Sequence, residues 1–192
     1  MNILSKRSAE MILLAGFLLA GCAPQSSENR TPLEEAMDTF ADGDYAMALI
    51  AFEGLIETQG STARTGAAWC QLRLGDYLSA YSQFALTAAD SLPDAYAGWA
   101  IVSWALNSPD GAIARADVVL TRQPQFIFSM DNRITASDLI WIQAASYYQV
   151  GKYSSSLERI RQLDSSFNPS LSDPDIARLL AEKLQMLGAV HF

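Results

Sequence analysis

A repeated turn signal constrains this chain more than any other feature of its sequence. The segments 43–45 (GDY), 75–77 (GDY) and 151–153 (GKY) occupy equivalent points, and Asn107 completes the series, with spacings of 32, 32 and 44 residues. Self-similarity at such a period is typical of a solenoid that repeats one supersecondary unit. The longer third spacing predicts an insertion of about ten residues before the fourth unit.

Small residues recur in register with these turns. The residues that lie seven positions before the turn residue are Ala36, Ala68, Ala100 and Ala144. The residues that lie five positions after it are Ala48, Ala80, Ala112 and Ser156. Short side chains at both points allow two helix axes to approach to about 8 Å. Nine positions after the turn the residues are bulky in three units of four, namely Phe52, Phe84 and Ile160, with Ala116 in the third. The pattern predicts close helix pairs whose bulky residues fill the next groove.

Start and stop signals for helices lie at the expected places. Thr31 can cap a helix in which Pro32 takes the first position and Glu34 completes a capping box. Gly43 can end that helix, and Asp44 can cap the next one. No segment alternates apolar and polar residues as a half-buried strand does. The sequence therefore predicts an all-α fold.

These repeats resemble tetratricopeptide repeats, which are helix-turn-helix units of about 34 residues. The resemblance covers 32–170, and Pro124 and Pro169 close the third and fourth units. The third unit departs most, with Asn107 for the turn glycine and Pro109 for the turn tyrosine. The resemblance implies a right-handed solenoid of about four repeats. An amphipathic segment within 171–192, from Asp173 to Leu187, is expected to cap its open end.

The N-terminal 21 residues have the layout of a secretory signal. Lys6 and Arg7 precede a ten-residue apolar run, 11–20, which is too short to span a bilayer. The run ends in Leu-Ala-Gly-Cys22, which resembles a bacterial lipobox, whose cysteine is acylated. We therefore expect a signal peptide at 1–21, a lipid on Cys22 and a polar tether at 22–31. The alternative is an ordinary signal that leaves Cys22 unmodified.

The resemblance to bacterial lipoproteins also implies a location. In enterobacterial lipoproteins an aspartate after the acylated cysteine retains the protein in the inner membrane, and here that residue is Ala23. We expect the protein on the outer membrane, facing the periplasm.

Composition argues against several function classes. A net charge of −8 repels nucleic acid. One histidine and two cysteines leave little from which to build a metal site or a Cys/His pair. No phosphate-binding loop or hydrolase motif occurs, so we predict no enzymatic activity, no cofactor and no small-molecule substrate. Cys70, in the segment AAWCQL, is expected to be a buried hydrophobe; the less favoured alternative is a reactive or intermolecular thiol.

The insertion near 125–136 (QFIFSMDNRITA) is unusually apolar for a loop. It contains Phe126, Ile127, Phe128 and Met130. We expect it to fold down over the end of the third unit, because monomers seldom expose contiguous apolar patches. A loop that binds a partner is the alternative.

In the repeat family, the first helix of each pair lines a concave surface. The corresponding positions here are Leu33, Met37, Phe40, Thr65, Trp69, Leu72, Ala97, Ile101, Trp104, Trp141, Ala145 and Tyr148, with Arg73 beside them. The spacing i, i+4, i+7 places each trio on one helix face. Such a groove suits a partner helix or an extended segment with large side chains. The alternative is that Trp69, Trp104 and Trp141 pack against the next repeat or under the insertion. Trp99 is expected in the core.

Two function classes follow from these resemblances. The first is an assembly or targeting factor similar to type IV pilotins and the tight-adherence pilus lipoprotein, whose groove holds a segment of a secretin or another outer-membrane subunit. The second is a scaffold that docks periplasmic enzymes such as cell-wall hydrolases. A subunit of the outer-membrane β-barrel insertion machinery is a weaker third.

Overall fold

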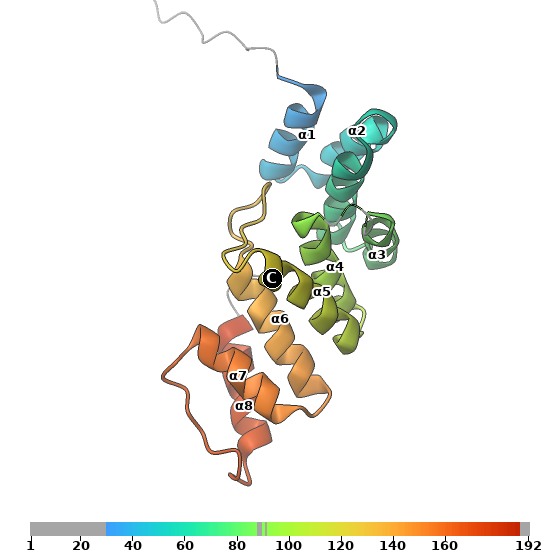
Figure 1. The fold of residues 1–192 in the computed structure, drawn as a ribbon. Helices are drawn as coiled ribbons and strands as arrows, with labels where there is room; N and C mark the ends of the chain where they lie inside the picture. Colours follow the sequence, from blue (N-terminus) through green and yellow to red (C-terminus); the bar gives the residue numbers. More distant parts are fainter. Residues whose placement is uncertain (1–29, 88–89, 91, 189–192) are drawn as a thin grey trace, which may run out of the picture.

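The computed structural model describes residues 30–87, 90 and 92–188, and these residues form helices joined by turns and loops (Figure 1). The helices are α1 (Pro32–Ala41), α2 (Tyr45–Arg73), α3 (Tyr77–Leu86), α4 (Pro93–Ala105), α5 (Pro109–Arg122), α6 (Ala136–Gln149), α7 (Tyr153–Leu163) and α8 (Ile176–Gly188). No strand occurs within the described ranges, which contain only one isolated β-bridge, between Ile127 and Thr135. The all-α prediction is confirmed.

Helix α2 is two helices joined at a kink. Gly60 has φ 54° and ψ −129°, a backbone conformation outside the helical region. The part before Gly60 pairs with α1, and the part after it, 61–73, pairs with α3. With α4/α5 and α6/α7 this makes four helical hairpins followed by α8, as the repeat pattern predicts. The kink itself was not predicted.

The four repeated turn residues share one backbone conformation. Gly43, Gly75 and Gly151 have φ of 87°, 83° and 72°, and Asn107 has φ 57°. Asparagine is the residue that best replaces glycine in this left-handed region, which explains why the third hairpin keeps its turn without glycine. The expected caps are also present, because the Asp44 carboxylate accepts a hydrogen bond from the backbone N–H of Met47 and Thr31 forms a capping box.

The small residues in register with the turns lie at the helix contacts. All eight of them, from Ala36 to Ser156, are at most 1% exposed. The ring of Phe84 lies over Gly98, where an added Cβ would meet the ring Cζ at 2.2 Å; Phe52 and Gly66 are related in the same way, with 2.5 Å to Cε1. Each phenylalanine thus fills a space that a glycine leaves on the first helix of the next hairpin. The sequence predicted the bulky residue but not its glycine partner.

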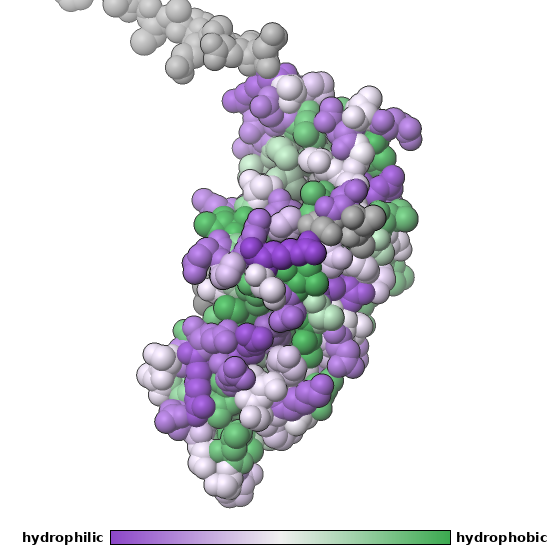
Figure 2. All heavy atoms as spheres, viewed as in Figure 1, coloured by the Kyte–Doolittle hydropathy of each residue, from purple (hydrophilic) through white to green (hydrophobic). Residues whose placement is uncertain are grey.

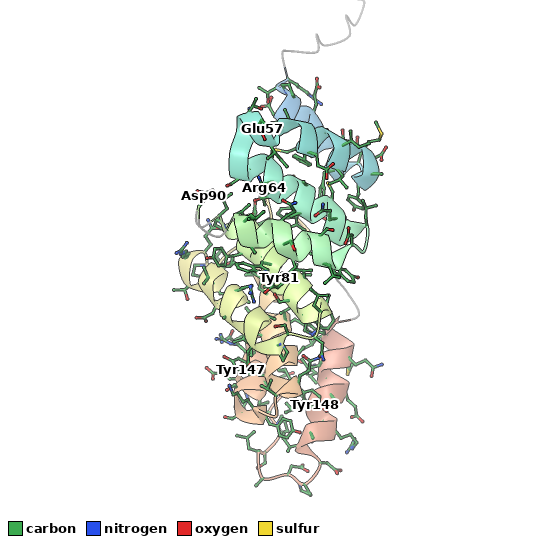
Figure 3. The ribbon with its side chains drawn as sticks, turned by 90° about the vertical axis from the view of Figure 1, so that its right-hand side faces the viewer. Glu57, Arg64, Tyr81, Asp90, Tyr147 and Tyr148 are labelled. Carbon is green, nitrogen blue, oxygen red and sulfur yellow. The ribbon has the colours of Figure 1, made fainter. Side chains whose placement is uncertain are left out.

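An aromatic and cationic cluster connects α3, α4 and α5. The Arg115 guanidinium lies 3.9 Å from the centre of the Trp99 ring, and its Nη2 donates to the Tyr81 hydroxyl at 3.0 Å. Trp99 is half-buried, so it belongs to the edge of the core. Figure 3, which is turned by 90° from the view of Figure 1, shows Tyr81 near the middle of the stack.

Helix α8 closes the C-terminal end of the stack. It begins at Ile176, three residues after the expected Asp173. Leu180 and Leu184 are buried, and Trp141 Nε1 donates to the Leu184 carbonyl at 3.0 Å. Lys183 pairs with Asp164, which follows α7. The predicted cap is therefore present, with a later start.

None of the helices that the structure describes is long and apolar enough to cross a membrane. The expected signal peptide, Cys22 and nearly all of the tether lie outside the described residues.

Candidate functional site on the concave face

The concave face is formed by the first helix of each hairpin, namely α1, 61–73 of α2, α4 and α6. The connection between α5 and α6, residues 123–135, lies against this face and reaches from α6 toward α1 (Figure 1). We call these residues the insertion. The surface of this side, seen in Figure 2, carries small hydrophobic patches separated by hydrophilic side chains.

Side chains of the insertion alternate between the core and the solvent. Phe126, Phe128 and Met130 are 2%, 1% and 9% exposed, whereas Ile127 is 60% exposed. This alternation is that of an extended chain with one face against the helices. Phe128 is stacked on Trp69, with ring centres 4.0 Å apart.

Backbone hydrogen bonds fold the insertion into a short hairpin. Phe128 N donates to Ile134 O at 2.9 Å, and Ala136 N donates to Phe126 O at 2.8 Å. Thr135 then forms a capping box with Asp138 at the start of α6. The insertion is therefore an ordered part of the fold.

Polar contacts attach the insertion to the second and third hairpins. Asp131 accepts a hydrogen bond from Arg73 Nη2 on α2 at 2.6 Å, and it also pairs with Arg133. The Arg133 contact lowers the pKa of the Asp131 carboxyl most, against the effect of burial, and Arg73 adds to the lowering. Ser129 Oγ donates to Asp94 on α4 at 2.6 Å.

The insertion is packed, as expected, but not where it was expected. The prediction placed it over the end of the third unit. It instead folds back onto the helices of the first two hairpins, because the large apolar surface of Phe40 and Trp69 lies there. Removing the apolar surface of Phe126 and Phe128 from water stabilises the folded state, and an exposed loop would not gain this free energy.

This packing covers part of the expected groove. Phe40, Trp69 and Ile101 are 1%, 0% and 5% exposed, so they are core residues in this structure and not open groove positions. For Trp69 the alternative of packing under the insertion is the one observed, and its Nε1 donates to the Asp94 carbonyl at 2.9 Å. Met37, Leu72, Arg73, Trp104, Trp141 and Tyr148 are half-buried.

The half-buried aromatics form a second cluster toward the C-terminal end. Trp104 and Trp141 meet edge to face with ring centres 5.2 Å apart. Tyr148 lies 5.7 Å from Tyr153, ring centre to ring centre. Neither tryptophan is an isolated anchor, since each packs on the other and Trp141 also contacts α8.

A pocket lies open on the concave face beside the insertion. Its volume is about 300 Å³, and it lies between α1, the second part of α2, the start of α4 and the insertion. Its wall includes Met37, Thr65, Leu92, Asp94, Ile127 and Met130. Of the residues around this pocket only Asp94 is charged. Burial raises the pKa of Asp94, and hydrogen bonds from Ser129 oppose that rise.

Sequence reasoning missed the role of Asp94. Pro93 and Asp94 follow the pattern of a helix start, which by itself indicates nothing more than a capping role for the carboxylate. Asp94 does lie in the first turn of α4, but its side chain lines the pocket and binds Ser129 of the insertion. No sequence signal connected residues 35 positions apart.

One further expectation concerns a reactive group. Cys70 is 0% exposed, as predicted, and burial raises the pKa of its thiol to about 12, which makes it unreactive at neutral pH. Within the part of the chain that the structure describes, no group of three or more His, Cys, Asp or Glu side chains is arranged to hold a metal ion.

The helical hairpins match solved structures. A tetratricopeptide repeat protein from Parabacteroides merdae aligns with a TM-score of 0.56 and 14% identity over 82% of this chain, which spans only 59% of that protein. A thermophilic tetratricopeptide-repeat protein of Thermus thermophilus aligns with a TM-score of 0.56 and 21% identity, over 82% of this chain and 81% of that one. The fold is that of tetratricopeptide-repeat proteins.

A third similar structure is a double mutant of MamA RS-1, with a TM-score of 0.59 and 14% identity over 82% of this chain and 92% of that one. No protein-family model matches the sequence, and no curated protein matches it significantly. The likeness in fold shows how the tetratricopeptide hairpins are arranged; it does not identify what they bind.

Proposed function

We propose that this protein is a non-enzymatic scaffold whose concave face binds an extended segment of a protein partner. The packing of the insertion on the concave face is the observation that supports this proposal. The insertion is an extended piece of chain seated on the concave face, with alternate large side chains against the helices. A surface that accommodates such a segment from its own chain has the shape and chemistry to take one from a partner alongside it.

The proposal includes a place of action. Acylation of Cys22 and sorting to the outer membrane would hold the folded repeats in the periplasm, within reach of subunits that assemble there. In that setting the partner is a secretin or another subunit of a pilus or secretion complex, and the protein acts in its targeting or assembly, as pilotins do. The lipobox-like sequence at 19–22 supports the anchor, and the tetratricopeptide fold supports a role in protein binding.

Site-specific photo-crosslinking in intact cells tests the binding face. A photoreactive residue in place of Ile127, which is 60% exposed beside the pocket, should crosslink to one envelope protein. The matched control is Leu78, which is 71% exposed on α3. Helix α3 lies on the other side of the stack from the insertion (Figure 1). Equal crosslinking from both positions, or crosslinking from Leu78 alone, would contradict a concave binding face.

The anchor is tested separately with Cys22→Ser. If Cys22 carries the lipid, the variant should leave the membrane fraction or accumulate as precursor, because one or more acyl chains provide the membrane affinity. A Cys22→Ser protein that still fractionates with the outer membrane would show that the anchor lies elsewhere.

A further inference from the structure

The pocket beside the insertion combines an apolar wall with one half-buried carboxylate. Met37, Leu92, Ile127 and Met130 supply the apolar surface. Asp94 supplies the charge, and no Lys, Arg or His is among the described residues that line the pocket. The hydrogen bond that fixes the Asp94 carboxylate comes from Ser129, a neutral hydroxyl at 2.6 Å.

The charge of Asp94 is not balanced from within the pocket. Removing a carboxylate from water is unfavourable unless a cation or several hydrogen bonds replace the solvent. The pocket lining also contains an unsatisfied group, since the Thr65 hydroxyl is buried and has no hydrogen-bond partner among the described residues. The carboxylate accepts hydrogen bonds and the hydroxyl can accept or donate one, so a ligand that brings donors and positive charge can satisfy both.

The geometry also restricts the shape of that ligand. A volume of about 300 Å³ is at the lower end of ligand pockets, enough for one long side chain but small for a cofactor. Arginine and lysine place a cationic head at the end of an apolar stem, which can lie against methionine, leucine and isoleucine. The net charge of −8 also favours approach of a basic segment.

We infer that this pocket binds a basic side chain, an arginine or a lysine, of a protein segment that lies along the concave face. The stem contacts Met37, Leu92 and Met130, and the cationic head donates to the Asp94 carboxylate. This inference rests on the proposed protein-binding function and adds the chemistry of the residue that is recognised. The partner segment is then one that carries a basic residue where it passes the start of α4.

Methyl NMR of the full chain can observe this binding without knowledge of the partner. With methyl-labelled methionine, Met37 and Met130 report on the pocket, whereas Met47 and Met186, which are 57% and 69% exposed and do not line it, report on non-specific contact. The probes are N-acetylarginine amide and N-acetyllysine amide. The neutral controls are N-acetylcitrulline amide and N-acetylnorleucine amide, which keep the stem and lack the charge.

We expect saturable shifts of the Met37 and Met130 signals with the two basic probes and about tenfold weaker binding of the neutral ones. Asp94→Asn keeps the size of the side chain and an acceptor for Ser129, and it should weaken binding of the basic probes about tenfold. The matched control is Asp110→Asn, because Asp110 follows a proline in the first turn of α5 as Asp94 does in α4, but it is exposed and outside the pocket.

A second variant tests the pocket if Asp94→Asn fails to fold. Thr62 is exposed at the pocket rim, so Thr62→Phe should block entry without disturbing the core. Thr58→Phe should not block it, because Thr58 is exposed, precedes the kink at Gly60 and does not line the pocket. Equal binding of charged and neutral probes, unmoved Met37 and Met130 signals, or binding retained in Asp94→Asn would overturn the inference. None of these results alters the crosslinking expected at Ile127, so failure of the pocket and failure of the proposed function are distinguishable.

Discussion

Substitution of Gly98 tests how neighbouring hairpins are held together. In the interior of a helix, replacing glycine by alanine ordinarily stabilises the fold by about 1 kcal/mol. At Gly98 the added Cβ would lie 2.2 Å from Phe84 Cζ and 2.7 and 2.8 Å from Cε1 and Cε2. Carbon atoms in contact are normally about 3.5–4.0 Å apart. Phe84 is 0% exposed, so its ring has no free space into which it can move.

Forcing such an overlap into a packed core costs about 1–3 kcal/mol. Because the overlap here involves three ring atoms, we take the upper part of that range, and Gly98→Ala should lower the free energy of unfolding by a net 1 to 2 kcal/mol, roughly, once helix propensity is included. The matched control is Gly54→Ala on α2, where the Cβ would meet nothing within 4 Å. That variant should gain about 0.5–1 kcal/mol.

Urea denaturation followed by circular dichroism at the helical band measures both changes. A double-mutant cycle then assigns the cause, because Phe84→Leu should cost less stability in the Gly98→Ala background than in the parent, as expected for residues in contact. If Gly98→Ala stabilised the protein as Gly54→Ala does, the packing of Phe84 against Gly98 would not be the contact that joins the second and third hairpins.

Three other predictions follow from single contacts. Phe128→Ala should cost about 3–5 kcal/mol in a urea melt, because it removes the ring stacked on Trp69, whereas Ile127→Ala should change stability by less than about 0.5 kcal/mol; equal effects would mean that the insertion is not packed. In a Cys22→Ser protein, Cys70 should react with a thiol reagent only at the rate of unfolding, since burial raises its pKa to about 12; fast reaction in the native state would refute this. Hydrogen bonds from Lys183 and then Ser166 lower the pKa of Asp164 to about 2. The Asp164–Lys183 pair therefore stabilises α8 at pH values above the ordinary carboxyl range, and this stabilisation is lost as the pH falls toward 2. Lys183→Met should raise the Asp164 pKa in an NMR titration, and an unchanged value would exclude the pairing.

Local signals in the sequence determined the hairpins. A turn position with a left-handed backbone conformation favours few amino acids, chiefly glycine and then asparagine. The turns are therefore marked in the sequence by Gly43, Gly75, Gly151 and Asn107. Closely packed helices tolerate only small side chains at the crossing, which is why the alanine series remained in register through a unit that lacks the turn glycine. Burial of Cys70 was predicted from the apolar segment AAWCQL in which it lies.

Details that depend on partners distant in sequence were less accessible. Gly66 and Gly98 are unremarkable in the sequence, and their role emerges only when the neighbouring hairpin supplies Phe52 and Phe84. The start of α8 was missed for a different, local reason. A turn in which the Asp173 carboxylate accepts a hydrogen bond from Asp175 N precedes the helix, so α8 begins at Ile176 and not where the amphipathic pattern begins.

By itself, the sequence determined the number of hairpins, their turns and caps, and the small residues at their crossings, because each of these depends on residues a few positions apart. The tertiary structure alone decided what occupies the concave face. The sequence shows that the insertion is apolar, but only the folded stack shows that Phe128 packs against Phe40 and Trp69. The same packing buries part of the expected groove and brings Ser129 to Asp94, so the pocket is a product of contacts between segments that the sequence keeps far apart.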